Sequence, residues 1–349
     1  MAAQELGYKN FVFQGGGVKG IAYIGALAAW ERHTKRQCDT DTQLQNISAS
    51  SVGSLFALLL ALRFDLSAIK HAYEKFEVHK ITENSLINSL SIPISLIQNY
   101  GIYDGKYLRQ ACEKILLDKT GSKHTTFNQL ASMKDPVSGL AFRHPIIIAA
   151  DNSYHRQVVF CADNCAYRDF DYHSGEIKIV DAIMASIAIP FLFKAQFFKT
   201  NSDNKLVKLN SYQEKCHVLV DGCLVNDYPW DLFKSEMNST LGFYFKLQKS
   251  SCNQASSLAA HMYQILCLSY STSRLYHEHN QQIHKQTVFI DTKYVNGINF
   301  KLSDHNKQLL LKRGYCSTAR YFKKIKKNTS ILKRWISSLH KALYLPNCS

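Results

Sequence analysis

Three short stretches of the sequence carry residues that could act on a substrate. The first, Gly15-Gly16-Gly17-Val18-Lys19-Gly20, lies between an apolar run and an apolar segment that begins at Ile21. Glycines let backbone N–H groups face a ligand, and at a helix N-terminus such groups bind a phosphate or stabilise a developing oxyanion. The pattern also satisfies the dinucleotide fingerprint G-x-G-x-x-G, although no acidic residue ends a plausible second strand. A Walker loop is excluded by its spacing, so an anion or oxyanion site, a cofactor loop and a structural turn stay open.

The second stretch is Ala49-Ser50-Ser51-Val52-Gly53, a variant of the G-x-S-x-G nucleophile elbow. In such an elbow a strand turns sharply into a helix, so the positions two before and two after the nucleophile must be small. Counting back two residues from Gly53 selects Ser51, whereas Ser50 would put Val52 where a small residue belongs. A Ser-rich turn is the alternative, but the position between an apolar strand and an apolar helix favours the elbow.

The third stretch ends the apolar run 218–220 with Asp221, followed by Gly222 and Cys223. A serine nucleophile needs a base, and none of the fourteen histidines stands in an arrangement that singles it out. An Asp at the C-terminal end of a parallel strand lies where α/β sheets display functional groups. Because Asp-Gly is also a common turn, this stretch alone does not identify Asp221 as the base.

Apolar runs and helical spacing alternate along the chain, which predicts an α/β fold with a mostly parallel sheet covered on both faces. Strands are expected at Phe11–Phe13, Leu44–Ser48, Pro145–Ala150, Gln157–Cys161, His217–Val220, Leu241–Phe245 and Thr287–Ile290. Helices are expected at Ile21–Trp30, Ser54–Leu62, Tyr107–Leu117, Asp181–Ile187, Ser257–His284 and Asn306–Phe322. The uncharged segment 84–103 is interpreted as a packed helix–loop excursion, with a lipid-touching cap over an active site as the alternative.

The composition suits a globular chain of 349 residues, in one large domain or two modest ones, with 46% hydrophobic and 20% charged residues. No apolar run reaches the roughly 20 residues of a membrane span, and no signal-peptide pattern precedes the first strand. The ten cysteines are scattered, so neither a structural zinc nor a disulfide frame is expected. We expect a cytoplasmic or peripheral-membrane protein in a reducing compartment, with non-classical secretion left open.

The net charge of +15 is concentrated at the C-terminal end, because eleven Lys or Arg and no acid follow Asp304. Apolar residues repeat at i, i+4, i+8 spacing from Ile331 to Leu343, which predicts a basic amphipathic helix that binds an anionic membrane surface. A helix packed on the domain with a solvated basic face is the alternative, and a nucleic-acid partner is not expected. The candidate membrane-binding residues are Lys323, Lys324, Lys326, Lys327, Lys333, Arg334 and Trp335.

These motifs occur in the order and approximate spacing of the patatin-like phospholipase family, which the chain resembles over residues 8–322. The likeness includes the segment from Asp181 to Pro190 and continues past Asp221 through Asn226 and Pro229. The resemblance implies a three-layer α/β/α sandwich as the catalytic domain over 8–322. The charge pattern places the basic amphipathic segment 323–349 after this domain. It also implies a Ser-Asp dyad of Ser51 and Asp221 that needs no catalytic histidine.

The same resemblance assigns the oxyanion hole to Gly15, Gly16 and Gly17, and supporting positions to Lys19, Gly20, Gly53 and Gly222. Lys19 replaces the commoner Arg, as in bacterial members that this chain resembles, while Ala49 and Cys223 also depart from the usual pattern without removing a catalytic atom. The implied activity is hydrolysis of phospholipid or other glycerolipid esters, of the phospholipase A or lysophospholipase type, with no cofactor and no metal. Acyl transfer, triacylglycerol hydrolysis and a catalytically idle lipid- or protein-binding domain are the alternatives, and the need for a protein activator is left open.

Overall fold

The computed structural model describes residues 7–82, 91–169, 171–246, 261, 264, 265, 268 and 280–343, the side chains of 91 and 329–343 excepted. Its strands are β1 (Asn10–Phe13), β2 (Asn46–Ser50), β3 (Gly101–Tyr103), β4 (His144–Asp151), β5 (Arg156–Phe160), β6 (Phe191–Phe193), β7 (Gln196–Thr200), β8 (Leu206–Leu209), β9 (His217–Asp221), β10 (Thr240–Phe245) and β11 (Thr287–Ile290). Its α-helices are α1 (Ile21–Thr34), α2 (Gly53–Ala61), α3 (Leu66–Lys75), α4 (Ser91–Asn99), α5 (Lys106–Thr120), α6 (Phe127–Ser132), α7 (Ile179–Ser186), α9 (Gln281–Lys285) and α10 (Asp304–Leu343). Short 3₁₀ segments are η1 (Gly17–Gly20), η2 (Val78–Thr82), η3 (Gly222–Leu224) and η4 (Pro229–Ser239).

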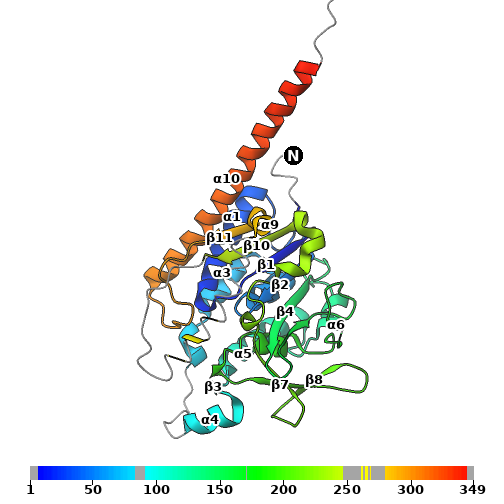
Figure 1. Cartoon of the computed structure of the whole chain (residues 1–349), viewed down its shortest axis with the longest axis vertical. Helices are drawn as coiled ribbons and strands as arrows, with labels where there is room; N and C mark the ends of the chain where they lie inside the picture. Colours follow the sequence, from blue (N-terminus) through cyan, green and yellow to red (C-terminus); the bar gives the residue numbers. More distant parts are fainter. Residues whose placement is uncertain are drawn as a thin grey trace, which may run out of the picture.

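The centre of the molecule is a sheet with the strand order β11-β10-β1-β2-β4-β9-β7-β8, in which β5 also pairs with β4 (Figure 1). The strands from β11 to β4 pair in parallel. In contrast, β5 and β9 run antiparallel to β4, and β7 runs antiparallel to β8 and β9. The predicted α/β fold with a mostly parallel sheet is therefore confirmed. The expectation that Asp221 ends a parallel strand is wrong, because β9 runs against its neighbours.

Helical layers cover both faces of the sheet, and strand alternation decides which side chain faces which layer. Phe11 and Phe13 of β1 belong to the larger hydrophobic cluster, which includes buried residues of α1, α2, α7 and α10. Val12, which lies between them, belongs to a second cluster with Trp230 of η4 and Ile283 of α9. The sheet is thus the middle of three layers, as the resemblance implied.

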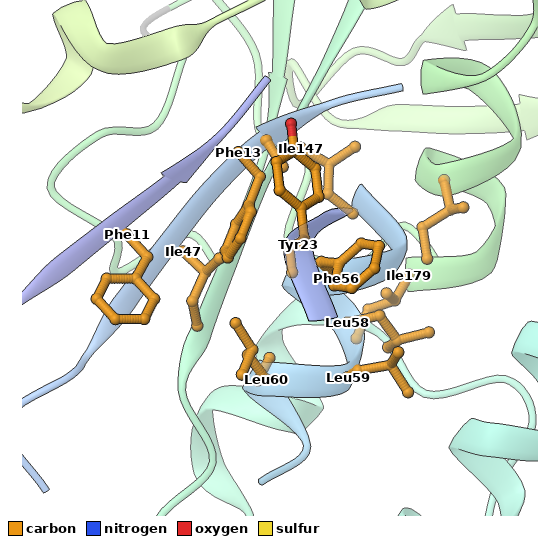
Figure 2. Close-up of a cluster of buried hydrophobic side chains, with 14 of the residues drawn as sticks. Phe11, Phe13, Tyr23, Ile47, Phe56, Leu58, Leu59, Leu60, Ile147 and Ile179 are labelled. Atoms are coloured by element: carbon orange, nitrogen blue, oxygen red, sulfur yellow. The ribbon is translucent and has the colours of Figure 1, made fainter. Parts of the chain in front are cut away.

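Aromatic side chains fill the larger cluster directly behind the glycine loop. Phe13 is stacked on Phe243 with ring centroids 5.0 Å apart and lies edge-on to Tyr23, also at 5.0 Å. Phe56 of α2 contacts both Phe13 and Tyr23, and Figure 2 shows these rings gathered between the strands and α2. The Tyr23 hydroxyl donates to the backbone carbonyl of Gln14 at 2.5 Å. This packing fixes the start of α1 against the end of β1, where the glycine loop begins.

Helix α10 packs along α1 and then extends beyond the rest of the molecule (Figure 1). The helices approach closely at Gly314, where an added Cβ would overlap the carbonyl of Ala22. The ring of His33 stacks on that of Phe322 with centroids 5.9 Å apart. The contact of Gly314 is with Ala22, near the start of α1, whereas that of Phe322, later in α10, is with His33, near the end of α1. The two helices therefore run in the same direction. The domain boundary expected at 322/323 lies inside this continuous helix.

Two predicted segments lie partly outside the described residues. The uncharged segment 84–103 contains α4 and β3, while its residues 84–90 lie outside the described ones. The predicted helix Ser257–His284 lies largely outside the described residues as well. Within them, the Asn280 side chain accepts hydrogen bonds from Gln282 and Ile283 N–H groups and begins a separate helix, α9. Helix α3 and the strands β6, β7 and β8 were not predicted.

Candidate active site

Ser51 occupies the sharp turn between β2 and α2, as the elbow pattern predicted. Its backbone has φ +50°, a left-handed conformation that is strained for a residue with a side chain. The turn is tight, since an added Cβ on Gly53 would lie 2.6 Å from the Phe13 carbonyl oxygen. The Ser51 N–H donates to the Ser186 hydroxyl of α7 at 2.8 Å, which holds the strained turn in place.

Asp221 and Ser51 are 170 residues apart in sequence and are joined by a hydrogen bond. The Ser51 hydroxyl donates to Asp221 Oδ2 at 2.8 Å, and both side chains are buried. The strand register explains the meeting: Ser50 of β2 pairs with Ile148 of β4, and Asp221 pairs with the next β4 residue, Ala149. An antiparallel β9 therefore carries the carboxylate to the level of the elbow.

The surroundings of Asp221 change its acidity. The residue is 1% exposed, and burial raises the pKa of its carboxyl to about 6, while hydrogen bonds from the Cys223 backbone and the Ser51 hydroxyl lower it by less. The Cys223 N–H donates to Asp221 Oδ1 at 2.8 Å, which leaves Oδ2 to the serine. A carboxylate with this proton affinity can take and return a proton near neutral pH.

The glycine loop lies against both of these residues. An added Cβ on Gly15 would overlap Cys223 Sγ and would lie 3.0 Å from Ser51 Cβ, so only glycine fits there. The Gly15 N–H donates to the Asp227 carbonyl at 2.9 Å and is not free to bind an oxyanion. Gly17 has φ +57°, where glycine is favoured.

In the part of the chain that the structure describes, no acceptor is observed for the N–H groups of Gly16 and Gly17. The Val18 N–H, by contrast, donates to the Gly297 carbonyl at 2.8 Å. The available backbone donors in the loop are therefore those of Gly16 and Gly17, and Gly15 serves close packing instead.

The supporting positions surround this centre. Lys19 and Gly20 lie in η1, directly before α1. Gly20 faces the Val52 side chain, and Gly222 lies against the Ile148 carbonyl and the Ser50 hydroxyl, so both keep the neighbouring strands and loops close.

An apolar cavity of about 140 Å³ lies beside Ser51. Its walls come from η1, α2, α3, η2 and α5, and no histidine is among the described residues that line it. This cavity could not be predicted from the sequence, because α3 was not predicted and the residues of the cavity wall are spread over most of the chain. Typical lining residues are Leu55, Leu59, Ile69, Ala72, Leu108 and Ala111.

A histidine lies in a triad-like arrangement elsewhere in the sheet. His217 Nδ1 is 2.7 Å from Asp151 Oδ2, and its Nε2 is 2.8 Å from the Thr200 hydroxyl. His217 begins β9 whereas Asp221 ends it, so this group is separated from Ser51 by the length of the strand. The three side chains come from β4, β7 and β9 and tie these strands together.

Two further features bear on cofactors and membranes. Among the described residues, no group of three or more His, Cys, Asp or Glu side chains is arranged to hold a metal ion. Across the same residues, no helix combines the length and apolar character that a membrane span requires.

The basic residues near the C-terminus lie on α10. The side chains of Lys323, Lys324, Lys326 and Lys327 are exposed to solvent. Those of Lys333, Arg334 and Trp335 lie outside the described residues, although the helix backbone continues through them. Helix α10 runs alongside α1, and its C-terminal part extends away from the rest of the molecule (Figure 1).

The fold and the site define an α/β protein with a buried serine–carboxylate pair next to a glycine loop and an apolar cavity. The family described as patatin-like phospholipase matches residues 11–234, a range that contains Ser51, Asp221 and the loop. The chain belongs to this family of lipid hydrolases, which confirms the resemblance seen in its motifs.

Individual relatives are distant. Protein R571 of Acanthamoeba polyphaga mimivirus is 24% identical over 237 residues, which span 68% of this chain and 65% of R571. Protein YqhO of Bacillus subtilis is 21% identical over 327 residues, 90% of this chain and 98% of YqhO. Among solved structures, VipD from Legionella pneumophila has a TM-score of 0.56 at 14% identity, with 91% of this chain and 67% of VipD covered. At such identity the likeness to VipD concerns the fold.

Proposed function

We propose that this protein is a serine acyl hydrolase of the phospholipase A or lysophospholipase type, with Ser51 as nucleophile and Asp221 as its base. The observation that carries the proposal is the 2.8 Å hydrogen bond from the Ser51 hydroxyl to Asp221 Oδ2, buried beside an apolar cavity. The raised pKa of Asp221 supports the role of a base that works near neutral pH.

The reaction follows from this geometry. Ser51 Oγ attacks the ester carbonyl carbon while its proton passes to Asp221 Oδ2. The N–H groups of Gly16 and Gly17 stabilise the resulting oxyanion, an effect worth roughly 3 kcal/mol per donor in comparable sites. Collapse of this intermediate expels the alcohol, which takes the proton from Asp221. Water then attacks the acyl-enzyme and gives a proton to Asp221, and collapse of this second intermediate releases the fatty acid while Asp221 returns the proton to Ser51 Oγ.

The cavity indicates how a lipid would lie. Its lining is almost entirely apolar, so it suits the acyl chain, and the alcohol portion with its polar head group would point toward solvent. A phospholipid or another glycerolipid ester satisfies this arrangement.

Ester cleavage by three purified variants tests the assignment. Ser51→Ala and Asp221→Asn should each lower the rate on a phospholipid by at least about a thousandfold. Ser50→Ala is the matched control, since Ser50 is the neighbouring serine and its hydroxyl lies 3.7 Å from Cys223 Sγ instead of on the carboxylate. Full activity in Ser51→Ala or Asp221→Asn would refute the dyad. Product analysis with a second alcohol present separates hydrolysis from acyl transfer, and triacylglycerol as substrate tests the neutral-lipid alternative.

We further propose that the exposed lysines Lys323, Lys324, Lys326 and Lys327 tether the protein to anionic lipid. They lie toward the end of α1 that is farther from the glycine loop, so the tether would leave the surroundings of Ser51 uncovered.

Sedimentation with phosphatidylserine-containing vesicles tests the tether on the full chain. Reversal of the four lysines to Glu should release the protein from the vesicles. The control reverses four exposed lysines elsewhere, Lys114, Lys123, Lys134 and Lys199, and should retain more binding. Equal loss in both variants would indicate only a general charge effect and would refute the tether.

A further inference from the structure

The cavity beside Ser51 adjoins a second, larger one. The first, here called the inner chamber, has a volume of about 140 Å³. The second, the outer groove, has a volume of about 800 Å³ and lies between α3, η2 and the segment 300–311. Four residues line both spaces and therefore form the wall between them: Tyr73, Phe76, Val78 and Phe300.

The two phenylalanines in this wall are held by other aromatic rings. Phe76 is stacked on Tyr107 of α5 with ring centroids 5.1 Å apart, and the Tyr107 hydroxyl also accepts a hydrogen bond from the Glu77 N–H at 3.1 Å. Phe300 meets Phe193 of β6 edge-on at 6.2 Å. Each of the two rings is thus held in place by an aromatic partner from another element.

The size of the inner chamber limits the chain that it can take. A dry cavity of about 150 Å³ holds one benzene molecule, which has six carbons. With the ester carbonyl at Ser51, the chamber has room for a similar number of chain carbons before the chain reaches Phe76 and Phe300. A longer acyl chain would have to pass between these rings into the outer groove, whose lining includes Ile24 and Leu311.

We propose that Phe76 and Phe300 end the acyl-binding chamber and set the preference of the enzyme at acyl chains of about six to eight carbons. This proposal rests on the proposed function and specifies its substrate class. Each methylene that enters apolar surroundings contributes about 0.8 kcal/mol, which corresponds to about fourfold in kcat/KM. Reactivity should therefore rise with chain length until the chamber is full and fall beyond that point.

The test measures kcat/KM of the full chain on p-nitrophenyl butyrate, octanoate, dodecanoate and palmitate. The wild type should prefer octanoate, with dodecanoate at least about tenfold lower. Phe76→Ala and Phe300→Ala should each raise the dodecanoate-to-octanoate ratio by about tenfold or more, because either change opens the chamber into the groove. Phe64→Ala is the matched control: Phe64 is partly buried near Lys119 and lines neither space, so its ratio should equal that of the wild type.

A second variant tests the chamber from the opposite side and does not depend on removal of a wall residue. Ala111 of α5 lines the inner chamber, and Ala111→Phe would fill it with a ring. The octanoate-to-butyrate ratio should then fall by about tenfold. A wild type that prefers palmitate, or unchanged ratios in both Phe76→Ala and Ala111→Phe, would overturn the chamber proposal alone. A wild type that cleaves none of the esters and does not react with a fluorophosphonate would overturn the proposed function together with it.

Discussion

Asp221→Asn should make the protein more stable while it removes activity. The pKa of this buried carboxyl rises from its ordinary value of 3.8 to about 6. At about 1.4 kcal/mol per pH unit, the ionised form therefore costs about 3 kcal/mol of folding free energy. When the pKa of a carboxyl is higher in the folded than in the unfolded state, the free energy of unfolding falls as the pH rises. The loss begins near pH 4, where the unfolded carboxyl ionises, and is complete above about pH 6.

Asparagine has the same shape and no charge, so it avoids this cost. Its carbonyl can accept from the Cys223 N–H and its amide can donate to the Ser51 hydroxyl, which preserves both neighbours of the carboxylate. The free energy of unfolding of Asp221→Asn should exceed that of the wild type by up to about 3 kcal/mol at pH 8. At pH 4 the two proteins should be nearly equal, because the native carboxyl is then neutral.

Urea unfolding of both proteins across this pH range measures the difference directly. A difference that does not change with pH, or a variant that is less stable at pH 8, would refute the reasoning, since burial would then not be the cause of the raised pKa.

Three other predictions concern the same centre. The value of kcat/KM on an uncharged ester should rise about tenfold per pH unit below about pH 6 and level off above it, because only ionised Asp221 can accept the serine proton. A pH-rate profile without this rise below about pH 6 would exclude Asp221 as the base. Ser186→Ala should lower kcat by roughly tenfold with little change in KM, because it leaves the buried Ser51 N–H without its partner; steady-state kinetics would show an unchanged kcat if the contact were unimportant. Gly17→Ala should lose most activity and roughly 1–2 kcal/mol of stability, since an L-residue is strained at φ +57° and its Cβ would overlap the Gly297 carbonyl. Activity and thermal stability equal to those of the wild type would contradict this prediction.

The residues proposed to react, Ser51 and Asp221, could be found from the sequence because their constraints are local. Only a small residue two positions after Ser51 lets the strand turn into the helix, and Gly53 meets that need within five residues of chain. Asp221 was found because an apolar run ends in Asp-Gly. The direction of that strand could not be found in the same way, since a buried strand is apolar whichever way it runs.

Features that depend on distant pairs escaped prediction. The Gly15 N–H was expected to face the oxyanion, but the Asp227 carbonyl, more than 200 residues later, accepts it. The wall between the two cavities likewise combines Phe76 with Phe300, and neither residue carries a local signal. Ser186 lies inside the segment 181–190 that the family resemblance had singled out, yet only its contact with the Ser51 N–H identifies its role.

The claim on which this account depends is that the Ser51 hydroxyl is activated by Asp221. A fluorophosphonate reacts only with an activated serine, and peptide mapping by mass spectrometry locates the adduct. The wild-type protein should carry one adduct, on Ser51, and Asp221→Asn should carry almost none. An adduct on Ser50 or another serine, or equal labelling of Ser51 in Asp221→Asn, would contradict the account.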